Sequence, residues 1–311
     1  MEYRGMSDVL DFFTSRERIF NFFDNRHMLD WLGDKSYLKL AFRAKMGYPL
    51  NLKNPITFSE KLQWLKLYDR NPLYTTLVDK YAVRQYIADK IGEEYLIPLV
   101  GGPWNSAEEI DFDALPEQFV LKCNHNSGGV IICRDKGSFD REAAVRRLDE
   151  DLKKNYYLEG REWPYKNVKP CIIAEKYMED ENGELRDYKF YCFNGIPRYS
   201  LITTDRILPD MPTCYTYFDM DFNMMPFYNS GPHARKPVKK PENYERMREL
   251  AQLLSKDMLH LRVDFYQVGG RIYLGELTFF DSSGMARFDP PEWDEKIGAW
   301  LKLPEKLENT Q

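Results

Sequence analysis

Hydrophobic residues recur with helical spacing among charged residues in the first quarter of the chain. This pattern is typical of packed helices. The stretch TFSEKLQWLKLYDR opens at Thr57 and has Glu60 three residues later, which is the spacing of a capping box. We therefore expect residues 1–78 to form a helical N-terminal region. A further helix is predicted over residues 77–95, with Gly92 ending it.

From Phe119 onward the pattern changes to short β-branched and aromatic runs. They predict strands over residues 119–123, 130–133, 171–175, 187–193, 196–202, 261–266 and 272–279. Helices are expected at about 139–154 and 242–259, and the second has one apolar face. Residues 205–240 are rich in proline and aromatic side chains and are interpreted as a long loop region, a kind of segment that is usually functional or mobile.

Composition and charge narrow the class of protein. The net charge of −5 disfavours the strongly basic surface that binds nucleic acid non-specifically. Five cysteines, an odd number without a C-x-x-C pair, indicate reduced thiols rather than disulfides or a zinc site. Neither a long apolar run nor a signal-peptide pattern occurs, so we expect a cytoplasmic protein without a membrane span. Peripheral membrane or partner association through a helix near residues 12–23 is an open alternative.

The stretch FVLKCNHNSGG, residues 119–129, runs from a predicted strand into a glycine-closed loop. It is not a Walker phosphate loop, because a β-branched run follows Gly129 where that motif needs Lys-Ser or Lys-Thr and a helix. Two interpretations stay open. The loop is a plain hairpin turn, or its backbone N–H groups face phosphate oxygens with Lys122 beside them. His125, within the loop, is a further candidate for ligand contact.

The stretch LRVDFYQVGGRIYLGELTFF, residues 261–280, predicts a hairpin with two acidic residues. A three-residue loop at 269–271 would pair Val268 with Ile272, place Asp264 opposite Glu276, and leave one polar and one apolar face. This polar face would carry Arg262, Asp264, Tyr266, Leu274, Glu276 and Thr278. A two-residue turn would instead put the two acids on opposite faces. Paired carboxylates repel unless a cation lies between them, and Mg²⁺ is the candidate; pairing of Arg262 with one or both acids is the alternative.

Two further segments carry candidate binding residues. The buried strand CIIAEKYMED, residues 171–180, ends in charged residues and suits a hinge whose backbone could pair with an adenine edge; an ordinary strand end is the alternative. In the predicted hairpin of residues 187–202, Lys189 shares a face with Asp187 and Tyr191. Lys189 either neutralises a phosphate or belongs to a solvated strand face.

In their order and spacing, these motifs resemble the TupA-like (teichuronopeptide-biosynthesis) ATP-grasp family of bacterial polysaccharide clusters. The motifs are DKYAVRQYI, FVLKCNHNSGG, IIAEKYM, RDYKFYCFNG, RVDFY and GELTFFDSSG, which together span most of the chain. The resemblance implies an α+β, ATP-grasp fold, in which two α+β subdomains with antiparallel sheets hold ATP between them. The expected divisions are the helical region at 1–78, a first subdomain with the glycine-rich loop at 79–175, and a second with the Mg-binding hairpin at 176–311.

The resemblance also implies roles for individual residues. The implied ATP contacts are Lys80, Lys122, Asn126, Ser127, Gly128 and Gly129, with an adenine-binding hinge at Glu175, Lys176, Tyr177 and Met178. The implied catalytic residues are Arg262, Lys189 and Ser283. The implied Mg²⁺ ligands are Asp264, Glu276 and Thr278. Thr278 stands where the family often has asparagine, and a hydroxyl is a poorer metal ligand than an amide oxygen.

The reaction implied is that of an ATP-dependent carboxylate–amine ligase. A carboxylate would attack the γ-phosphorus of ATP, and an amine would displace phosphate from the acyl phosphate to give an amide. The expected partners are ATP, a sugar acid or precursor of a bacterial surface polysaccharide, and an amino acid or amine. Acceptor recognition is expected at residues 205–240 and in the helical N-terminus. The alternatives are a phosphotransferase, a glycosyltransferase that binds a nucleotide sugar, and a non-catalytic nucleotide-binding module.

Overall fold

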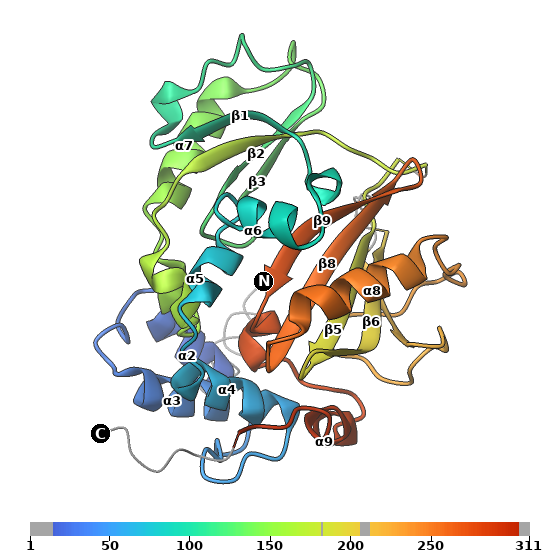
Figure 1. Cartoon of the computed structure of the whole chain (residues 1–311). Coiled ribbons are helices and arrows are strands. Elements are labelled where there is room, and N and C mark those ends of the chain that lie inside the picture. Colours follow the sequence, from blue (N-terminus) through green and yellow to red (C-terminus); the bar gives the residue numbers. More distant parts are fainter. Residues whose placement is uncertain (1–14, 182, 206–211, 305–311) are drawn as a thin grey trace, which may run out of the picture.

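The computed structural model describes residues 15–181, 183–205 and 212–304. The structure contains two antiparallel sheets, and a group of helices packs at one end of the five-stranded sheet (Figure 1). The four-stranded sheet has the order β1-β4-β2-β3, and the five-stranded sheet has the order β7-β6-β5-β8-β9. The predicted α+β class with two antiparallel sheets is therefore confirmed.

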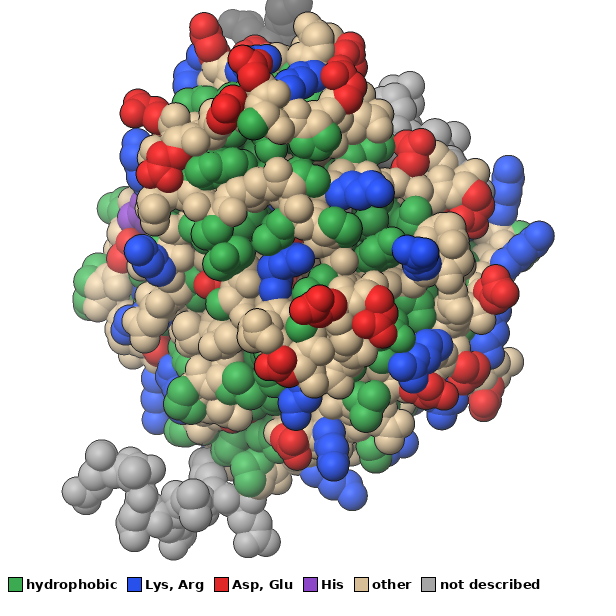
Figure 2. Space-filling model, turned by 45° about the horizontal axis from the view of Figure 1, so that its top comes forward, with side chains coloured by type: hydrophobic (Ala, Val, Ile, Leu, Met, Phe, Trp, Pro, Cys, Tyr) green, Lys and Arg blue, Asp and Glu red, His purple; other side chains and the backbone are tan. Residues whose placement is uncertain are grey.

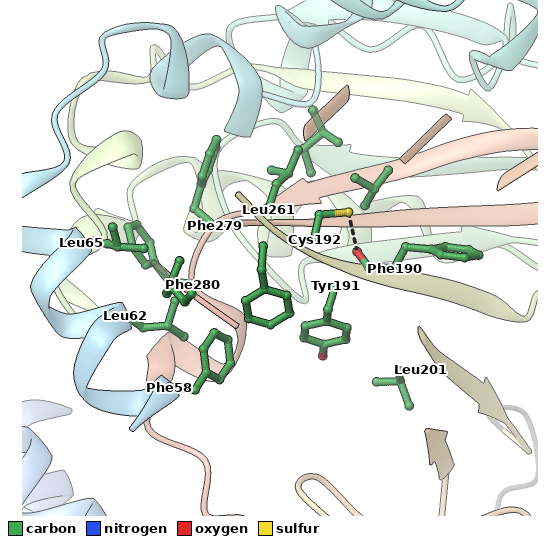
Figure 3. Packing of buried hydrophobic residues seen from close by; sticks show 14 of the residues in the cluster. Phe58, Leu62, Leu65, Phe190, Tyr191, Cys192, Leu201, Leu261, Phe279 and Phe280 are labelled. Carbon is green, nitrogen blue, oxygen red and sulfur yellow. Dashed lines mark hydrogen bonds between the residues drawn. The ribbon is translucent and has the colours of Figure 1, made fainter. Parts of the chain in front are cut away.

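The helical region contains α2 (Arg16–Asp24), α3 (Asp34–Met46), α4 (Phe58–Tyr68) and α5 (Leu73–Val78). Helix α4 begins as predicted, because Thr57 Oγ1 accepts the N–H of Glu60 at 3.1 Å and the Glu60 carboxylate accepts the N–H of Thr57 at 3.3 Å. Apolar side chains of α4 face the end of the second sheet (Figure 3). Phe58, Leu62 and Leu65 are labelled there near Phe280, and the Phe58 ring lies 5.5 Å from that of Phe193 on β5. This packing fixes the helical region against the second sheet.

The predicted helix over residues 77–95 is wrong in its extent. Helix α5 ends at Val78, and α6 (Val83–Lys90) begins after a turn, with η1 (Glu93–Tyr95) following. Asp79 causes the break, since its Oδ1 accepts the N–H groups of Tyr81 at 2.8 Å and Ala82 at 3.1 Å. The break leaves Lys80 in a turn rather than on a helix.

The first sheet is built from β1 (Leu99–Trp104), β4 (Ile172–Lys176), β2 (Phe119–Cys123) and β3 (Val130–Cys133). Strand β1 was not predicted, because its sequence LVGGPW carries glycine and proline instead of a strand pattern. Helix α7 (Arg141–Leu152) packs Leu148 against this sheet, and η2 (Ala107–Glu109) lies beside it. The sheet and α7 form a core of their own.

The second sheet is built from β7 (Cys214–Asp219), β6 (Ile196–Thr204), β5 (Asp187–Phe193), β8 (His260–Val268) and β9 (Arg271–Thr278). Strand β7 lies inside residues 205–240, so the loop interpretation of that region is wrong for these residues. Helix α8 (Tyr244–Ser255) covers one face with its predicted apolar side (Figure 1). The remaining elements are η3 (Tyr156–Leu158), η4 (Trp163–Asn167), η5 (Asp281–Gly284) and α9 (Glu292–Gly298).

The structure can be compared with what composition predicted for the cysteines, the surface charge and membrane-spanning helices. The five cysteines are all free thiols, and all are buried. On the face drawn in Figure 2, acidic and basic side chains alternate without a patch of one sign. In the part of the chain that the structure describes, no helix is long and apolar enough to span a bilayer. Residues 12–14 of the expected docking helix lie outside the described residues, so peripheral association through it stays a prediction.

Candidate active site

The acidic residues of the β8–β9 hairpin lie directly opposite each other. Asp264 pairs with Glu276 in the register of the two strands, as predicted. The predicted three-residue loop is wrong, because Val268 pairs with Arg271 across a two-residue turn. A β-bulge at Gly275, between the pairs formed by Asp264 and Phe265, adds the residue that brings the acids back onto one face.

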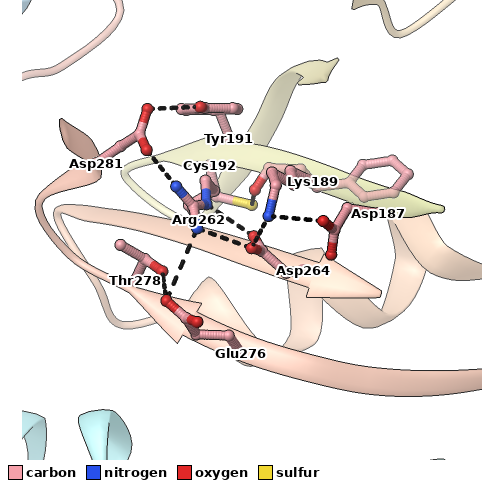
Figure 4. Close-up of polar contacts among 10 residues, drawn as sticks. Asp187, Lys189, Tyr191, Cys192, Arg262, Asp264, Glu276, Thr278 and Asp281 are labelled. Carbon is pink, nitrogen blue, oxygen red and sulfur yellow. Dashed lines mark hydrogen bonds and ion pairs between the residues drawn. The ribbon is translucent and has the colours of Figure 1, made fainter. Parts of the chain in front are cut away.

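The bulge also changes which side chains share the polar face. Leu274 pairs with Phe265 and is buried in the core, so its predicted place on the polar face is wrong. Tyr273 pairs with Tyr266, which lies two residues after Asp264 and so on the same side of the sheet as Asp264. Toward the end of the hairpin that meets α4, the polar face keeps Arg262, Asp264, Glu276 and Thr278 (Figure 4).

Asp264 is held between two cations. Arg262 Nε donates to Asp264 Oδ1 and Nη2 to Oδ2, both at 2.8 Å, and Lys189 Nζ of the neighbouring strand β5 also contacts Oδ2 (Figure 4). Although burial would raise the pKa of Asp264, these two cations hold it below its usual value. Burial would likewise lower the pKa of Lys189, yet Asp187 and Asp264 raise it. The charged forms are therefore favoured, and the predicted pairing of Arg262 with an acid is observed.

Glu276 is less engaged than Asp264. Its side chain is 33% exposed and its Oε1 lies 3.8 Å from Arg262 Nη2. Thr278 donates its hydroxyl to Glu276 Oε1 at 2.7 Å. Arg262 Nη1 contacts Asp281, whose other oxygen accepts the Tyr191 hydroxyl at 2.7 Å. The cluster thus has a surplus of carboxylates over cations.

The first sheet brings a second group of charges to the same place. Lys122 Nζ on β2 lies 2.7 Å from Glu175 Oε2 on β4, and both side chains are nearly buried. Lys80 Nζ donates to the backbone carbonyl of Asn126, and burial lowers the pKa of Lys80 while Glu276 raises it. A narrow pocket of about 30 Å³ is lined by Lys80, Lys122 and Glu175 on one side and by residues 274–277 of β9 on the other.

The side chains of the predicted hinge, Glu175–Met178, do not all point toward the charged cluster. Glu175 points inward to Lys122, whereas Lys176 is exposed and donates its backbone N–H to the Pro98 carbonyl at 2.9 Å. The Tyr177 hydroxyl donates to Glu179 at 2.9 Å and accepts from Arg134 Nε at 3.1 Å. Met178 is half-buried. The side chains of Lys176 and Tyr177 are thus directed away from the charged cluster.

The glycine loop lies over the same region. Asn124 fixes its base, because its side chain donates to the Lys169 carbonyl at 3.0 Å and accepts the Cys171 N–H at 2.8 Å. His125 is buried, and its Nε2 lies 3.1 Å from the Lys154 carbonyl. Burial lowers the pKa of His125, so its neutral form is favoured under the loop. The loop residues Asn126, Ser127, Gly128 and Gly129 follow, with Arg147 near the Gly128 carbonyl at 3.4 Å.

A cavity of about 700 Å³ opens between the glycine loop, the polar end of the hairpin and the helical region. Ser127 of the glycine loop and Arg262, Glu276 and Thr278 of the hairpin line it on one side. The helical region lines it on another side with Asn21, Asp24, Asn25, His27, Asp30 and Lys45. Described residues of 205–240 do not reach this cavity. They line a separate one of about 810 Å³ with residues 234–240.

Ser283 lies next to two buried charged residues that the sequence analysis missed, Lys66 and Glu162. Lys66 Nζ donates to the Ser283 hydroxyl at 2.7 Å, to the Ser283 carbonyl at 2.8 Å and to the Gly160 carbonyl at 2.7 Å. Glu162 is buried and lines the cavity together with Ser283. Lys66 had a signal, since it lies four residues after Leu62, at a position that helical spacing places on the buried side of α4. No such signal marked Glu162, because the segment around it shows no periodic pattern of hydrophobic residues.

Comparison with known proteins gives the family. A family model described as TupA-like ATPgrasp matches residues 60–302. The chain belongs to this family. The resemblance stated from the motifs is therefore confirmed, and the charged cluster described above lies within the matched residues of this TupA-like ATP-grasp protein.

One solved structure supports the fold. An L-amino acid ligase from Bacillus licheniformis has 13% identity and a TM-score of 0.50, and the match covers 91% of this chain and 65% of that one. A D-alanine–D-alanine ligase from Bacillus anthracis complexed with ATP has 15% identity and a TM-score of 0.38, covering 66% of this chain and 54% of that one. The chain thus spans little more than half the length of this second ligase. A search of curated proteins finds no match.

The ATP-grasp chain also contains Asp-x-Asp triplets, a motif that could hold a nucleotide sugar in a glycosyltransferase. They lie at residues 111–113, 149–151 and 219–221. In each, an aspartate is used to fix the backbone: Asp111 caps the N–H groups of 113 and 114, Asp149 that of 107, and Asp219 those of 221 and 223. The described triplets do not line the 700 Å³ cavity, which disfavours the glycosyltransferase alternative.

Proposed function

We propose that this protein is an ATP-dependent carboxylate–amine ligase that joins an amino acid or amine to a sugar acid of a bacterial surface polysaccharide. The observation that carries the proposal is the shared cavity, because Ser127 of the glycine loop and Arg262 and Glu276 of the hairpin line it together. Family membership and the ATP-grasp fold support the use of ATP. With ATP as substrate, we also propose a cytoplasmic location.

In this proposal ATP binds between the two sheets. Lys80, in the turn before α6, and Lys122, on β2, supply cations from one side. Lys189 and Arg262 of the second sheet supply them from the other. Phosphate oxygens would replace the acceptors that these side chains now use, such as Glu175 for Lys122. The pocket between the sheets holds only about 30 Å³. ATP entry therefore requires the sheets to move apart, with Glu175–Met178 as the hinge.

Mg²⁺ is the proposed metal, and the residues fit it. Among the described residues there is no cluster of three or more His, Cys, Asp or Glu side chains that could hold a metal ion alone. Mg²⁺ does not need one, since it commonly takes one or two carboxylates and completes its shell with phosphate oxygens and water. Asp264 and Glu276 would be these carboxylates, with Thr278 orienting Glu276. When bound, the ion neutralises charge on the phosphates.

The chemistry proposed has two steps. A carboxylate oxygen attacks the γ-phosphorus, and Arg262 and Lys189 stabilise the charge on the transferring phosphoryl group. An amine then attacks the carbonyl carbon of the acyl phosphate, and phosphate leaves. Arg262 is suited to this role because Asp264 and Asp281 hold its guanidinium from two sides and fix its orientation.

The polar wall of the helical region supports a hydroxylated, charged substrate. Its side chains offer amides at Asn21 and Asn25, carboxylates at Asp24 and Asp30, and one cation at Lys45. Amide and carboxylate groups match sugar hydroxyls, and Lys45 matches a carboxylate.

The test is product analysis with ATP, Mg²⁺, a panel of uronic acids and a panel of amino acids. Release of inorganic phosphate should require one member of each panel, and mass spectrometry should find their amide. Glu276→Gln should abolish both signals. A stable phosphorylated sugar without phosphate release would instead establish the phosphotransferase alternative.

A further inference from the structure

The cavity wall holds a buried acid that the two proposed steps do not use. Glu162 is 4% exposed and lines the cavity together with Arg262 and Ser283. Ser283 accepts a hydrogen bond from Lys66 Nζ at 2.7 Å, and Lys66 is the cation that acts most strongly on Glu162. Lys66, Ser283 and Glu162 therefore form a buried cluster with a carboxylate at the cavity surface.

The backbone is arranged to hold Lys66 in this cluster. Ser282 and Ser283 both have positive φ, 48° and 54°, a conformation that residues other than glycine rarely adopt. The conformation presents both the hydroxyl and the carbonyl of Ser283 to Lys66 Nζ. With the Gly160 carbonyl, three acceptors match the three N–H donors of the ammonium. Strain of this kind clusters at functional sites, where surrounding contacts maintain it.

The electrostatics suit a carboxylate that gains and loses a proton. Burial raises the pKa of Glu162 toward neutrality, while Lys66 and Ser283 lower it and limit the rise. The charged and titratable groups around it, from every packed element, are Lys66, Tyr156, Tyr165, Arg262, Glu276 and Asp281. A base of this kind works best when its pKa lies near the working pH.

We propose that Glu162 is the base that takes the proton from the acceptor's amine, with Lys66 and Ser283 as its positioning residues. This inference rests on the ligase function proposed above. As the C–N bond forms, the bond from the acyl carbon to the phosphate oxygen breaks, and phosphate leaves with its electron pair. One N–H proton of the attacking amine passes to a Glu162 carboxylate oxygen. The acceptor is thus an amine that enters this cavity as its free base.

The experiment compares two nucleophiles with the uronic acid that the wild-type chain activates. L-Alanine must lose a proton as it attacks and needs the base. Hydroxylamine is a far weaker base and a strong nucleophile, so it traps the acyl phosphate as a hydroxamate with little help. Glu162→Gln should lower the rate of amide formation by about 10²- to 10⁴-fold. It should leave the rate of hydroxamate formation close to that of the wild type.

Two further variants control for structure. Glu162→Gln leaves Lys66 buried without its counter-charge, and this variant can therefore fold poorly. The double variant Lys66→Met/Glu162→Gln removes both charges. It should show the same loss of amide formation with hydroxamate formation retained. Glu159→Gln removes an exposed carboxylate of the same wall and should keep the wild-type ratio of amide to hydroxamate. Glu162→Asp should recover part of the amide rate.

The pH profile gives a second readout. The rate of amide formation by the wild type should rise with pH as Glu162 ionises. This rise in rate should be absent in Glu162→Gln. Equal loss of amide and hydroxamate in Glu162→Gln, or no loss of either, overturns the assignment of Glu162. Absence of hydroxamate from the wild type with every uronic acid overturns the ligase proposal itself.

Discussion

Asp264 and Glu276 face each other across β8 and β9 only because Gly275 forms a bulge between them and the turn. Without this extra residue, a two-residue turn would put the carboxylates on opposite faces of the sheet. A Cβ atom at Gly275 would lie 2.7 Å from Cε2 of Tyr266. This close approach explains why glycine suits this position. It also means that a substitution at Gly275 tests the importance of the bulge.

Gly275→Ala should therefore destabilise the hairpin. The added methyl group must displace the Tyr266 ring or shift the bulge, which should lower the free energy of unfolding by about 1–3 kcal/mol. ATP-dependent activity should fall as well, because Glu276 follows directly in the chain. Urea denaturation measures the first effect. Tyr266→Leu combined with Gly275→Ala should restore stability toward that of Tyr266→Leu alone; additive losses would contradict a clash at the bulge.

The two carboxylates should respond differently to removal of charge. Asp264→Asn leaves Arg262 and Lys189 buried with fewer counter-charges, so the free energy of unfolding should fall by roughly 3 kcal/mol. Glu276→Gln should cost less than about 1 kcal/mol, because its side chain is 33% exposed and its ion pair is long. Both variants should lose ATP-dependent phosphate release. Equal stability losses, measured by urea denaturation, would show that Asp264 does not anchor the cluster.

Lys122 should contribute to ATP affinity. A charge-assisted hydrogen bond is worth about 1.5–3 kcal/mol, so Lys122→Met should raise the Kd for ATP by about 10- to 100-fold. Isothermal titration calorimetry measures this change. Lys153→Met, which removes an exposed lysine after α7, should leave the Kd unchanged. An unaltered Kd in Lys122→Met would mean that Lys122 only neutralises Glu175.

His260 should make the fold sensitive to acid. Burial lowers the pKa of His260 from 6.5 to about 4, and its Nδ1 donates to the Cys192 carbonyl at 3.0 Å. Between these two values the unfolded chain binds a proton that the folded chain does not, so stability present above pH 6.5 is lost as the pH falls toward 4. The loss due to this residue should reach about 3 kcal/mol.

Urea denaturation from pH 7.5 to 4 measures this dependence. His260→Asn should remove about one proton from the slope of the free energy of unfolding against pH. Leu261→Val is the matched control, because it creates a small defect next to His260 without removing a titrating group. It should lower stability by the same amount at every pH. A slope in His260→Asn equal to that of the wild type would contradict the assignment.

The sequence indicated the hairpin well because its polar and charged residues alternate along two strands. The correct pairing of Asp264 with Glu276 was nevertheless reached through the wrong turn, since the bulge at Gly275 depends on packing against Tyr266 rather than on local pattern. Strand β7 was hidden by the surrounding prolines, and the break before α6 depended on the side chain of Asp79.

The buried cluster of Lys66, Ser283 and Glu162 was less accessible to sequence reasoning. Its members lie on α4, before η4 and in η5, and only the tertiary fold brings them together. The pairs Lys122–Glu175 and Lys189–Asp264 are also contacts between strands that are distant in sequence. Residue types in a motif indicated which side chains would be important, but not which partners they would have.

Isotope transfer from the carboxylate tests the ligase proposal most directly. The uronic acid that supports turnover is labelled with ¹⁸O in its carboxyl group and incubated with the full chain, ATP, Mg²⁺ and the amine. An acyl phosphate passes one carboxyl oxygen to the phosphate that leaves, so mass spectrometry should find one ¹⁸O atom in the released inorganic phosphate and one fewer in the amide. Unlabelled phosphate, or a phosphorylated sugar that keeps its full label, would contradict the proposal.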